Sequence, residues 1–394
     1  MRIALVSREF PPGSRSGGIG TYTEKTARAL SRLGQEVHVF TEGDPNTQGS
    51  PESPVRMHFL PEIQARPDEQ RVMRRSLAVA RALWTSGPFD VVQASEWDAE
   101  AVAYALRPRS VLVTRLATPA YVVNRLNGMS RRARVRTAVV GRLERLQARL
   151  SDQVISPSRA LADIVTRDWR LNPARVKVVP TGIEIPTAGA ASPPRGLAGK
   201  RYVLYFGRLE RRKGVKAWID ALPAVLERDR DITAVFAGQD LGLAGVPVQD
   251  YARKTLGAYM NRMVFFPRLP HSQLFPLVAG ATLVVMPSTW ESIANACLEA
   301  MALGRPVIAT NGSGFAEIMR DRVSGFLVEP EDHEQLARVA IDALADPARL
   351  AEIGRAAYAR ARDFDLDKMA SRLLDLYGDL VKSPRVRAAA GAPG

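Results

Sequence analysis

Two glutamates eight residues apart are the side chains best suited to binding sugar or ribose hydroxyls. They are Glu291 and Glu299, in the segment Pro287–Thr310, PSTWESIANACLEAMALGRPVIAT. Glu291 follows a short apolar run and Glu299 lies in the first turns of the next predicted helix, at the mouth of a parallel sheet. If all eight steps were helical, their Cα atoms would be about 12 Å apart. The carboxyl groups of glycoside hydrolases lie roughly 5–10 Å apart, so two separate hydroxyl-binding tasks fit better than one hydrolytic pair.

Two basic residues follow another apolar run in the same half of the chain. The stretch YVLYFGRLERRKGV places Arg208 and Lys213 directly after the predicted strand Tyr202–Phe206. A guanidinium fork and a mobile ammonium can hold a diphosphate from two sides. Basic residues often follow strands, so this pattern gains its weight from Glu291 and Glu299.

A glycine loop follows the first predicted strand. In PPGSRSGGIGTYTEKTARAL, Gly17 and Gly18 immediately precede a predicted helix. Their N–H groups and the positive end of the helix predict a place for a phosphate or an acceptor hydroxyl. A dinucleotide fingerprint, Gly18-x-Gly20, is less favoured, because the glycines lie about ten residues beyond the strand and Thr23 replaces the third small residue. A plain flexible turn is the other alternative.

The elements that position these residues alternate in type along nearly the whole chain. Short apolar runs alternate with segments of helical period, which predicts an α/β protein with parallel sheets. The predicted strands are Ile3–Ser7, Glu36–Thr41, Val55–Leu60, Asp90–Ala94, Ser110–Leu116, Gln153–Ser156, Val176–Pro180, Tyr202–Phe206, Ile232–Phe236, Met263–Pro267, Thr282–Met286, Val307–Thr310 and Gly325–Val328. The predicted helices of the first half are Ile19–Leu33, Glu69–Leu83, Ala99–Leu106, Arg131–Leu150 and Arg159–Arg167, and helices dominate from Glu331 to Val381.

The length of the chain predicts two domains, because 394 residues exceed one ordinary core. The small, Pro- and Gly-rich stretch TAGAASPPRGLAGK is typical of a linker. We predict an N-terminal Rossmann-like domain at 1–186, a linker at 187–200 and a C-terminal Rossmann-like domain at 201–366. A helix at 367–382 is expected to cross back to the first domain, followed by a disordered tail at 383–394.

The composition excludes several classes of protein. No apolar run approaches the roughly 20 residues that span a bilayer. The N-terminus, MRIALVSREFPP, lacks the apolar core and cleavage site of a signal peptide. Cys297 is the only cysteine, so neither an internal disulfide nor a cysteine-based metal site is expected. A cytoplasmic protein is predicted.

The positive charge is concentrated in one stretch. The chain carries a net charge of +14, and the stretch from Arg107 to Arg149 holds eleven arginines and one acid, Glu144. The predicted helix Arg131–Leu150 places five apolar residues along one face, which predicts a core-facing stripe under a basic exterior. These residues are Val135, Val139, Leu143, Leu146 and Leu150. A solvated face and contact of Arg131–Arg149 with a membrane surface both remain open, whereas nucleic-acid binding is disfavoured because the patch lacks interleaved aromatic residues.

Five stretches, in order and at family-like spacing, resemble the retaining glycosyltransferases of family 4. They are GGIGTYTEKTARALSRLGQEVHVFT, ISPSRALADIV, VVPTGIEI, VLYFGRLERRKGV and WESIANACLEAMALGRPVIAT, and with GSGFAEIMRDRVSGFLVEP they span most of the chain. The segment with the two glutamates matches the E-x7-E motif of the family and is the most specific. The resemblance implies a GT-B fold, in which two Rossmann-like doubly wound parallel-sheet domains face each other across a cleft. It implies that the N-terminal domain, 1–186, binds the acceptor and that the C-terminal domain, 201–366, binds the nucleotide sugar. It also implies transfer from a nucleotide sugar with retention of configuration and without a metal or other cofactor.

The resemblance further implies roles for the matched residues on the donor side. Arg208 and Lys213 match the pair that contacts the donor diphosphate, and Glu299 matches the acid that holds the ribose. Glu291 matches the acid near the donor sugar, and we expect it to be catalytic together with Arg208 and Lys213. Backbone positions also match, at the sugar and phosphate and in the glycine loop near donor and acceptor. They are Ile293, Ala294, Asn295, Gly17 and Gly18.

The chain departs from the family pattern at two places. Ala117, in RLATP, stands where family members often have the histidine of RLHTP, and Ile293-Ala294 replaces the usual Phe-Gly. Both changes leave the identity of the sugar open. Glu96, in QASEW, resembles an acid often found on the acceptor side, with helix capping as the alternative. Glu96 and Ala117 are therefore the predicted acceptor-side residues.

The expected activity is transfer of a hexose-type sugar from a nucleoside-diphosphate sugar, with a UDP-sugar favoured, to a hydroxyl acceptor. The acceptor is a glycan, a lipid or a small metabolite. We expect attack from the face that the leaving group departs, because the sequence offers no convincing nucleophile for a double displacement. The alternatives are a GT-B nucleotide-sugar epimerase or hydrolase, and a catalytically silent protein that binds sugar nucleotides.

Overall fold

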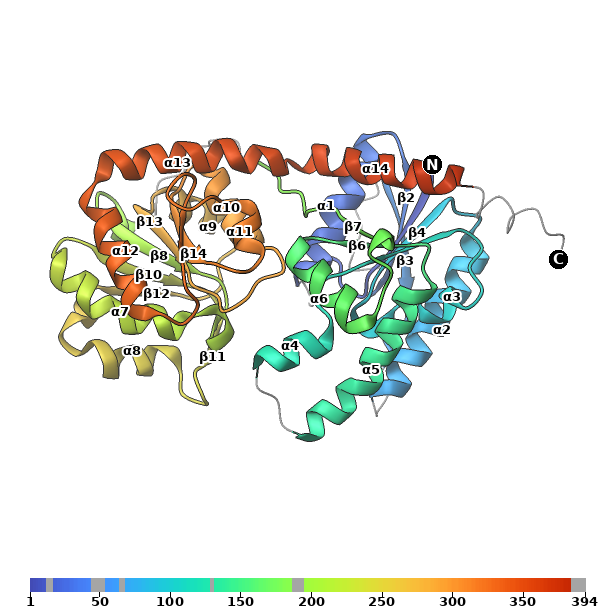
Figure 1. The fold of residues 1–394 in the computed structure, drawn as a ribbon, viewed down its shortest axis with the longest axis horizontal. Coiled ribbons are helices and arrows are strands. Elements are labelled where there is room, and N and C mark those ends of the chain that lie inside the picture. Colours follow the sequence, from blue (N-terminus) through green and yellow to red (C-terminus); the bar gives the residue numbers. More distant parts are fainter. Residues whose placement is uncertain (12–16, 44–53, 64–67, 128–130, 186–194, 384–394) are drawn as a thin grey trace. The chain divides into compact units, whose positions relative to one another are not determined.

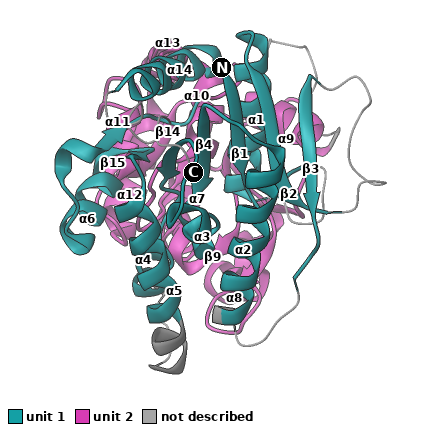
Figure 2. Cartoon of the chain, turned by 90° about the vertical axis from the view of Figure 1, so that its right-hand side faces the viewer, with its two compact units in different colours: residues 1–182, 366–394 teal, residues 183–365 magenta. Residues whose placement is uncertain are grey.

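The computed structural model shows two compact units, each with its own sheet (Figure 1). It describes the whole chain except residues 12–16, 44–53, 64–67, 128–130, 186–194 and 384–394. Unit 1 comprises Met1–Gly182 and Leu366–Gly394, and unit 2 comprises Ile183–Asp365 (Figure 2). Most of the predicted linker and nearly all of the predicted tail lie outside the described residues.

Unit 1 is built around a seven-stranded sheet in the order β3-β2-β1-β4-β5-β6-β7, with every pairing parallel. The inner strands are continuous apolar runs because helices cover both faces of the sheet. The strands are β1 (Arg2–Val6), β2 (Glu36–Glu42), β3 (Val55–Leu60), β4 (Val91–Ser95), β5 (Val111–Arg115), β6 (Gln153–Ser156) and β7 (Val176–Val178). All seven lie within two residues of the predicted strands.

Helices from both ends of the chain cover this sheet. They are α1 (Gly18–Arg32), α2 (Asp68–Ser86), α3 (Val102–Ala105), α4 (Ala120–Asn127), α5 (Arg131–Leu150), α6 (Arg159–Trp169) and α14 (Leu366–Lys382). The last of these, α14, packs beside α1 and buries Leu373 and Tyr377 in the same core as Ile3 and Leu5. No described helix is both long and apolar enough to cross a membrane.

Helix α6 shows how local sequence produces these elements. The Ser158 hydroxyl accepts a hydrogen bond from the Leu161 N–H and caps the start of the helix. Leu161, Val165 and Trp169 recur every four residues and are buried on the sheet. Arg170 ends the helix in the left-handed conformation, with φ of 52°. This helix follows the expected pattern of an apolar stripe against the core.

The prediction for the face of α5 is wrong at three of its five residues, whereas Leu143 is partly buried and packs against a small core cluster that includes Val140. Val139, Leu146 and Leu150, expected in the core, are each 39% exposed. The side chain of Val135 lies outside the described residues. The buried face instead carries Glu144 and Gln147, both with no exposed surface. Their polar groups bind backbone atoms of neighbouring loops, so tertiary hydrogen bonds override the apolar pattern.

The helix predicted at Ala99–Leu106 is shorter than expected. A 3₁₀ turn spans Trp97–Ala99, and α3 begins only at Val102. The chain turns sharply at the end of the 3₁₀ turn, because Asp98 and Ala99 have φ of 58° and 47°. Left-handed residues cannot continue a right-handed helix, so a tight loop separates the two elements.

Unit 2 contains a six-stranded sheet in the order β12-β10-β8-β13-β14-β15 and a small sheet of two strands. The strands are β8 (Tyr202–Phe206), β9 (Leu209–Glu210), β10 (Thr233–Ala237), β11 (Asp240–Gly242), β12 (Met263–Phe266), β13 (Leu283–Met286), β14 (Val307–Thr310) and β15 (Phe326–Val328). The helices are α7 (Val215–Arg228), α8 (Val248–Leu256), α9 (His271–Ala279), α10 (Asn295–Ala302), α11 (Gly314–Ile318), α12 (His333–Ala345) and α13 (Pro347–Ala361). The predicted two-sheet parallel α/β architecture is confirmed; β9 and β11 were not predicted.

Each large sheet has one point where the strand order reverses direction. In unit 1 the chain runs outward from β1 through β2 to β3 and then returns to β4 on the other side of β1. In unit 2 it runs from β8 through β10 to β12 and returns to β13 beside β8. Ligands of open parallel sheets bind at the carboxyl ends of such strand pairs. Ligand sites are therefore expected in the loops after β1, β4, β8 and β13.

Candidate active site

In unit 2 the loops after β8 and β13 are pressed against each other. Gly214, with φ of 72°, lies so close to the second loop that an added Cβ would be 1.8 Å from the Pro287 carbonyl oxygen. The Thr289 N–H donates to the Arg212 carbonyl oxygen at 2.9 Å. Only glycine permits this approach. The loop that holds Arg208 and Lys213 is thereby fixed beside the loop that holds Glu291.

Lys213 and Glu291 form an ion pair at this junction. Glu291 is 8% exposed. Burial alone would raise the pKa of its carboxyl group, but the Lys213 ammonium and the Arg212 guanidinium hold that pKa below its ordinary value. Glu291 is therefore a buried, ionised carboxylate whose charge is matched by cations from the neighbouring loop.

Of the two residues predicted to bind the diphosphate, Arg208 and Lys213, Arg208 is the more accessible to solvent. Its side chain is 52% exposed, against 24% for Lys213. The guanidinium contacts Glu210 at 3.1 Å, and Arg212 contacts the same carboxylate at 3.2 Å. Arg208 thus presents much of its fork to solvent beside the Lys213–Glu291 pair.

The start of α10 brings the other predicted donor-side residues to the same edge. Ile293 and Ala294 lead into Asn295, the first helical residue, and Glu299 follows one turn later with 9% exposure. The Asn295 side-chain oxygen and the Ser313 hydroxyl are buried and have no hydrogen-bond partner among the described residues. Buried polar atoms without partners are rare and call for an explanation such as a bound ligand.

In unit 1 the predicted glycine loop is already engaged with a side chain. The Gly17 N–H donates to Glu9 Oε2 at 2.9 Å. An added Cβ would lie 2.5 Å from that oxygen at Gly17, and 2.9 Å from the Glu9 Cβ at Gly20. The Glu9 carboxylate thus occupies the anion position at the N-terminus of α1 that the sequence assigned to a ligand. Gly18 has open space around an added Cβ.

The structure brings the two predicted acceptor-side residues into direct contact. Glu96 has no exposed surface, and its two carboxylate oxygens accept from the Ala117 N–H at 2.9 and 2.7 Å. Burial raises the pKa of Glu96 to about 7, although the Ala117 amide, the Ser95 hydroxyl and Arg115 oppose the shift. Glu96 therefore holds the loop that contains Ala117, as a buried carboxyl group bound to backbone.

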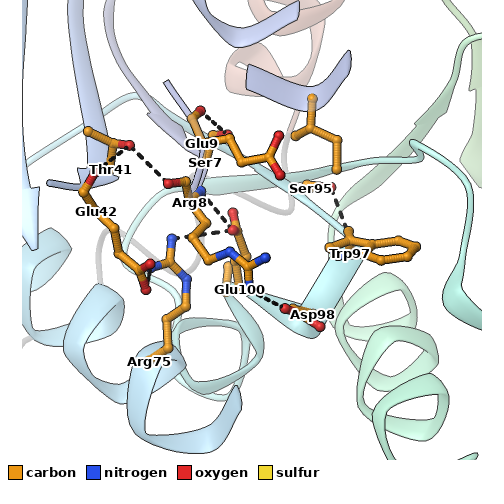
Figure 3. Close-up of polar contacts among 12 residues, drawn as sticks. Ser7, Arg8, Glu9, Thr41, Glu42, Arg75, Ser95, Trp97, Asp98 and Glu100 are labelled. Atoms are coloured by element: carbon orange, nitrogen blue, oxygen red, sulfur yellow. Dashed lines mark hydrogen bonds and ion pairs between the residues drawn. The ribbon is translucent and has the colours of Figure 1, made fainter. Parts of the chain in front are cut away.

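A charged cluster that the sequence analysis missed lies at the same edge (Figure 3). The Arg8 guanidinium contacts Asp98 at 2.7 Å, and the Arg8 N–H donates to Glu100 at 2.8 Å. The buried Arg75 bridges Glu42 and Glu100. A usable signal was present, because Arg8, Glu42 and the Glu96–Glu100 stretch lie at the carboxyl ends of three neighbouring parallel strands, β1, β2 and β4.

Within the described ranges, no group of three or more His, Cys, Asp or Glu side chains is arranged to hold a metal ion. The Asp229 and Asp231 pair, which resembles a metal-binding D-x-D pattern, has a local structural role. Asp229 forms an ion pair with Arg201 at 3.1 Å and accepts from the Asp231 N–H.

Comparison with known proteins accounts for both units. Residues 16–185 match the family described as Glycosyltransferase Family 4, and residues 192–360 match Glycosyl transferases group 1. The D-inositol 3-phosphate glycosyltransferase of Salinispora tropica is 28% identical, with 98% of this chain and 87% of that protein aligned. The glycogen synthase of Mycobacterium tuberculosis is 30% identical, with 96% of this chain and 94% of that protein aligned.

Solved structures share the fold of the whole chain. Sucrose-phosphate synthase from Thermosynechococcus elongatus gives a TM-score of 0.75 at 22% identity and covers 96% of this chain and 98% of its own. Anabaena HepE in complex with UDP gives a TM-score of 0.71 at 21% identity and covers 96% of this chain and all of its own. These likenesses show a GT-B fold. Together with the family matches over both units, they show that this chain is an enzyme of glycosyltransferase family 4.

Proposed function

We propose that this enzyme transfers a hexose from a nucleoside-diphosphate sugar, with UDP favoured, to a hydroxyl acceptor with retention and without a bound metal. The observation that carries the proposal is the Lys213–Glu291 ion pair beside the half-exposed Arg208, at the reversal point of the unit 2 sheet. Two fixed cations at that edge suit a diphosphate. HepE structures with UDP and with UDP-glucose support the choice of base and sugar.

Each donor-side residue has a task in this proposal. Arg208 and Lys213 bind the diphosphate, and Glu299 binds the ribose hydroxyls. Glu291 orients Lys213 and faces the sugar, while the backbone at Ile293 to Asn295 receives sugar hydroxyls and phosphate. The unpaired Asn295 oxygen supports a polar ligand at this place.

The reaction balances without an enzyme nucleophile. The bond between the sugar anomeric carbon and the phosphate oxygen breaks, and the acceptor oxygen forms a new bond on the same face. The acceptor proton passes to the departing phosphate oxygen. Arg208 and Lys213 stabilise the negative charge that develops on the diphosphate, which is electrostatic catalysis by prepositioned charges.

The first experiment is a thermal-shift panel of nucleoside diphosphates and nucleotide sugars in EDTA. We expect UDP and one UDP-hexose to raise the Tm, and NMR of the product anomeric proton to show retention. UDP release without any acceptor, at the full turnover rate, would instead indicate a hydrolase or epimerase. Binding without any turnover would indicate a silent binding protein, and no stabilisation by any nucleotide would overturn the donor site.

Helix α5 supports a second part of the proposal, peripheral contact with an anionic membrane surface. Val139, Leu146 and Leu150 form an exposed apolar stripe, and the exposed Arg142 and Arg149 flank it. An apolar stripe beside arginines suits the boundary between lipid headgroups and acyl chains. Such contact would bring a lipid-linked acceptor to unit 1.

Vesicle sedimentation tests this contact. We expect binding to phosphatidylcholine vesicles that contain phosphatidylserine, weaker binding in high salt, and loss of binding in Leu146→Glu. Leu106→Glu is the matched control, because Leu106 is a 67% exposed leucine of the same unit outside α5. Equal binding of both variants would exclude α5 as the contact.

A further inference from the structure

The loop after β4 holds two adjacent non-glycine residues in the left-handed conformation, Asp98 and Ala99. Such a conformation costs about 1–3 kcal/mol per residue and persists only where the surroundings hold it in place. Strained loops of this kind concentrate at ligand sites. This one follows a strand at the reversal point of the unit 1 sheet.

Glu144, on the buried face of α5, holds this loop and the next one together. Its Oε1 accepts from the Asp98 N–H and its Oε2 accepts from the Ala120 N–H, each at 3.3 Å. Asp98 belongs to the loop after β4, and Ala120 follows the Ala117 loop after β5. One carboxyl group therefore connects the two loops that Glu96 also joins at Ala117.

Gln147, one turn further along α5, completes the support. Its Oε1 accepts from the Ala101 N–H at 2.8 Å, and its Nε2 donates to the Ser95 carbonyl oxygen at 2.9 Å and to the Thr114 hydroxyl at 3.1 Å. Both ends of the loop after β4 are thus bound to the same helix.

Stability alone does not account for a carboxyl group at position 144. Helix α6 packs on the sheet through Leu161, Val165 and Trp169, whereas α5 buries an acid. Burial, and then the charge of Glu96, raise the pKa of Glu144 well above its ordinary value. Burying such a group costs several kcal/mol unless it is paired, and its hydrogen bonds go to backbone groups of the two loops.

We propose that Glu144 is a positioning residue that fixes the loops after β4 and β5 in the geometry that binds the acceptor. This inference rests on the proposed function, in which unit 1 binds the acceptor and unit 2 binds the nucleotide sugar. Trp97 and Thr118, both partly exposed on these loops, are the side chains whose placement depends on it. Loss of Glu144 is then expected to weaken acceptor use without affecting donor binding.

The test compares wild type, Glu144→Ala, Glu144→Gln and the control Asp163→Ala, an exposed acid on α6. UDP affinity is measured by calorimetry, and UDP release from UDP-glucose is measured with water alone. Transfer is measured with glucose, maltotetraose or D-inositol 3-phosphate, whichever the wild type glycosylates. We expect Glu144→Ala to raise the acceptor KM at least tenfold and to lower the ratio of transfer to hydrolysis, with the UDP Kd unchanged within twofold.

Glu144→Gln keeps one acceptor oxygen for the two N–H groups, so an intermediate acceptor KM is expected. Hydrogen exchange of residues 95–101 and 117–121 is expected to accelerate in the order wild type, Gln, Ala. An unchanged acceptor KM in a folded Glu144→Gln and Glu144→Ala would overturn the inference, as would an equal loss of UDP affinity. Failure of the proposed function is separate, because it would show in the wild type as no UDP binding or no transfer to any probe.

Discussion

At the edges of the two sheets, the pKa values of buried carboxyl groups are shifted in opposite directions. In unit 2, burial raises the pKa of Glu291, but the positive charges of Lys213 and Arg212 outweigh this effect, so the pKa of its carboxyl group is lowered. In unit 1, burial dominates at Glu96, Glu100 and Glu144, and their pKa values are raised. The difference follows from the partners, which are side-chain cations in unit 2 and mainly backbone amides at Glu96 and Glu144.

The charged groups at the two edges therefore have different roles. The unit 2 edge keeps cationic groups partly exposed, as binding of an anionic diphosphate requires. The unit 1 edge directs its charged groups inward, where they fix loop geometry.

The largest expected effect is loss of a unit 2 cation. Arg208→Ala and Lys213→Ala are each expected to lower turnover about 100- to 1,000-fold, because developing charge on the leaving diphosphate is no longer stabilised. Steady-state kinetics with UDP release as the readout measures this. Arg211→Ala is the control, because Arg211 lies in the same loop with its side chain 80% exposed.

Lys213→Ala also leaves the Glu291 carboxylate buried without its principal partner. We therefore expect it to lower the Tm, which Arg208→Ala leaves nearly unchanged. In the double variant Lys213→Ala/Glu291→Gln the Tm is expected to recover while turnover does not. Recovery of turnover in the double variant would show that the ion pair serves folding rather than catalysis.

The second prediction concerns the close approach of the unit 2 loops. Gly214→Ala is expected to destabilise the protein by more than about 3 kcal/mol, because the new Cβ meets the Pro287 carbonyl and φ is unfavourable. Gly199→Ala has nearly the same φ, 73°, but nothing within 4 Å of the new Cβ. It is expected to cost only about 1 kcal/mol. Equal costs in urea unfolding would show that the loops separate easily.

How far the sequence predicted the site depends on how local each contact is. Arg208, Lys213 and Glu291 each lie just after a strand, so strand prediction alone placed them at one sheet edge. Glu144 binds residues 46 and 24 positions away, and no periodicity reveals that. The only hint was its isolation as the single acid among eleven arginines.

The apolar stripe of α5 shows why the fold was easier to predict than the face of one helix. Val139, Leu146 and Leu150 have the helical periodicity of a core stripe, and in α6 the residues with such periodicity, Leu161, Val165 and Trp169, are in the core. In α5, Gln147 and Glu144 instead satisfy backbone groups of the sheet edge. The strands were predictable because continuous apolar runs between helices have one dominant solution.

The third prediction is a pH dependence of stability from unit 1. The pKa of Glu96 is about 7 in the folded protein against 4.5 ordinarily, so the folded state binds the proton more tightly. Its stabilising contribution is fully present below about pH 4.5 and is lost as the pH rises through about 7, a change of about 3 kcal/mol. Urea unfolding between pH 4.5 and 8 should show this decline in wild type and in Asp163→Asn. Glu96→Gln should show a flatter profile, and an unchanged slope would mean that Glu96 is ionised throughout.

The smallest expected effect distinguishes the charge of Arg208 from the geometry of its guanidinium group in binding the diphosphate. Arg208→Lys keeps the positive charge but replaces the planar fork by a point charge. Because the guanidinium is 52% exposed and already contacts Glu210, folding should be unaffected. We expect the UDP Kd to rise about tenfold, near 1.4 kcal/mol, while UMP, which lacks the second phosphate, binds equally to both forms. If UDP also binds equally, Arg208 acts through charge alone, and the selectivity of this edge for a diphosphate depends on Lys213 and the loop backbone.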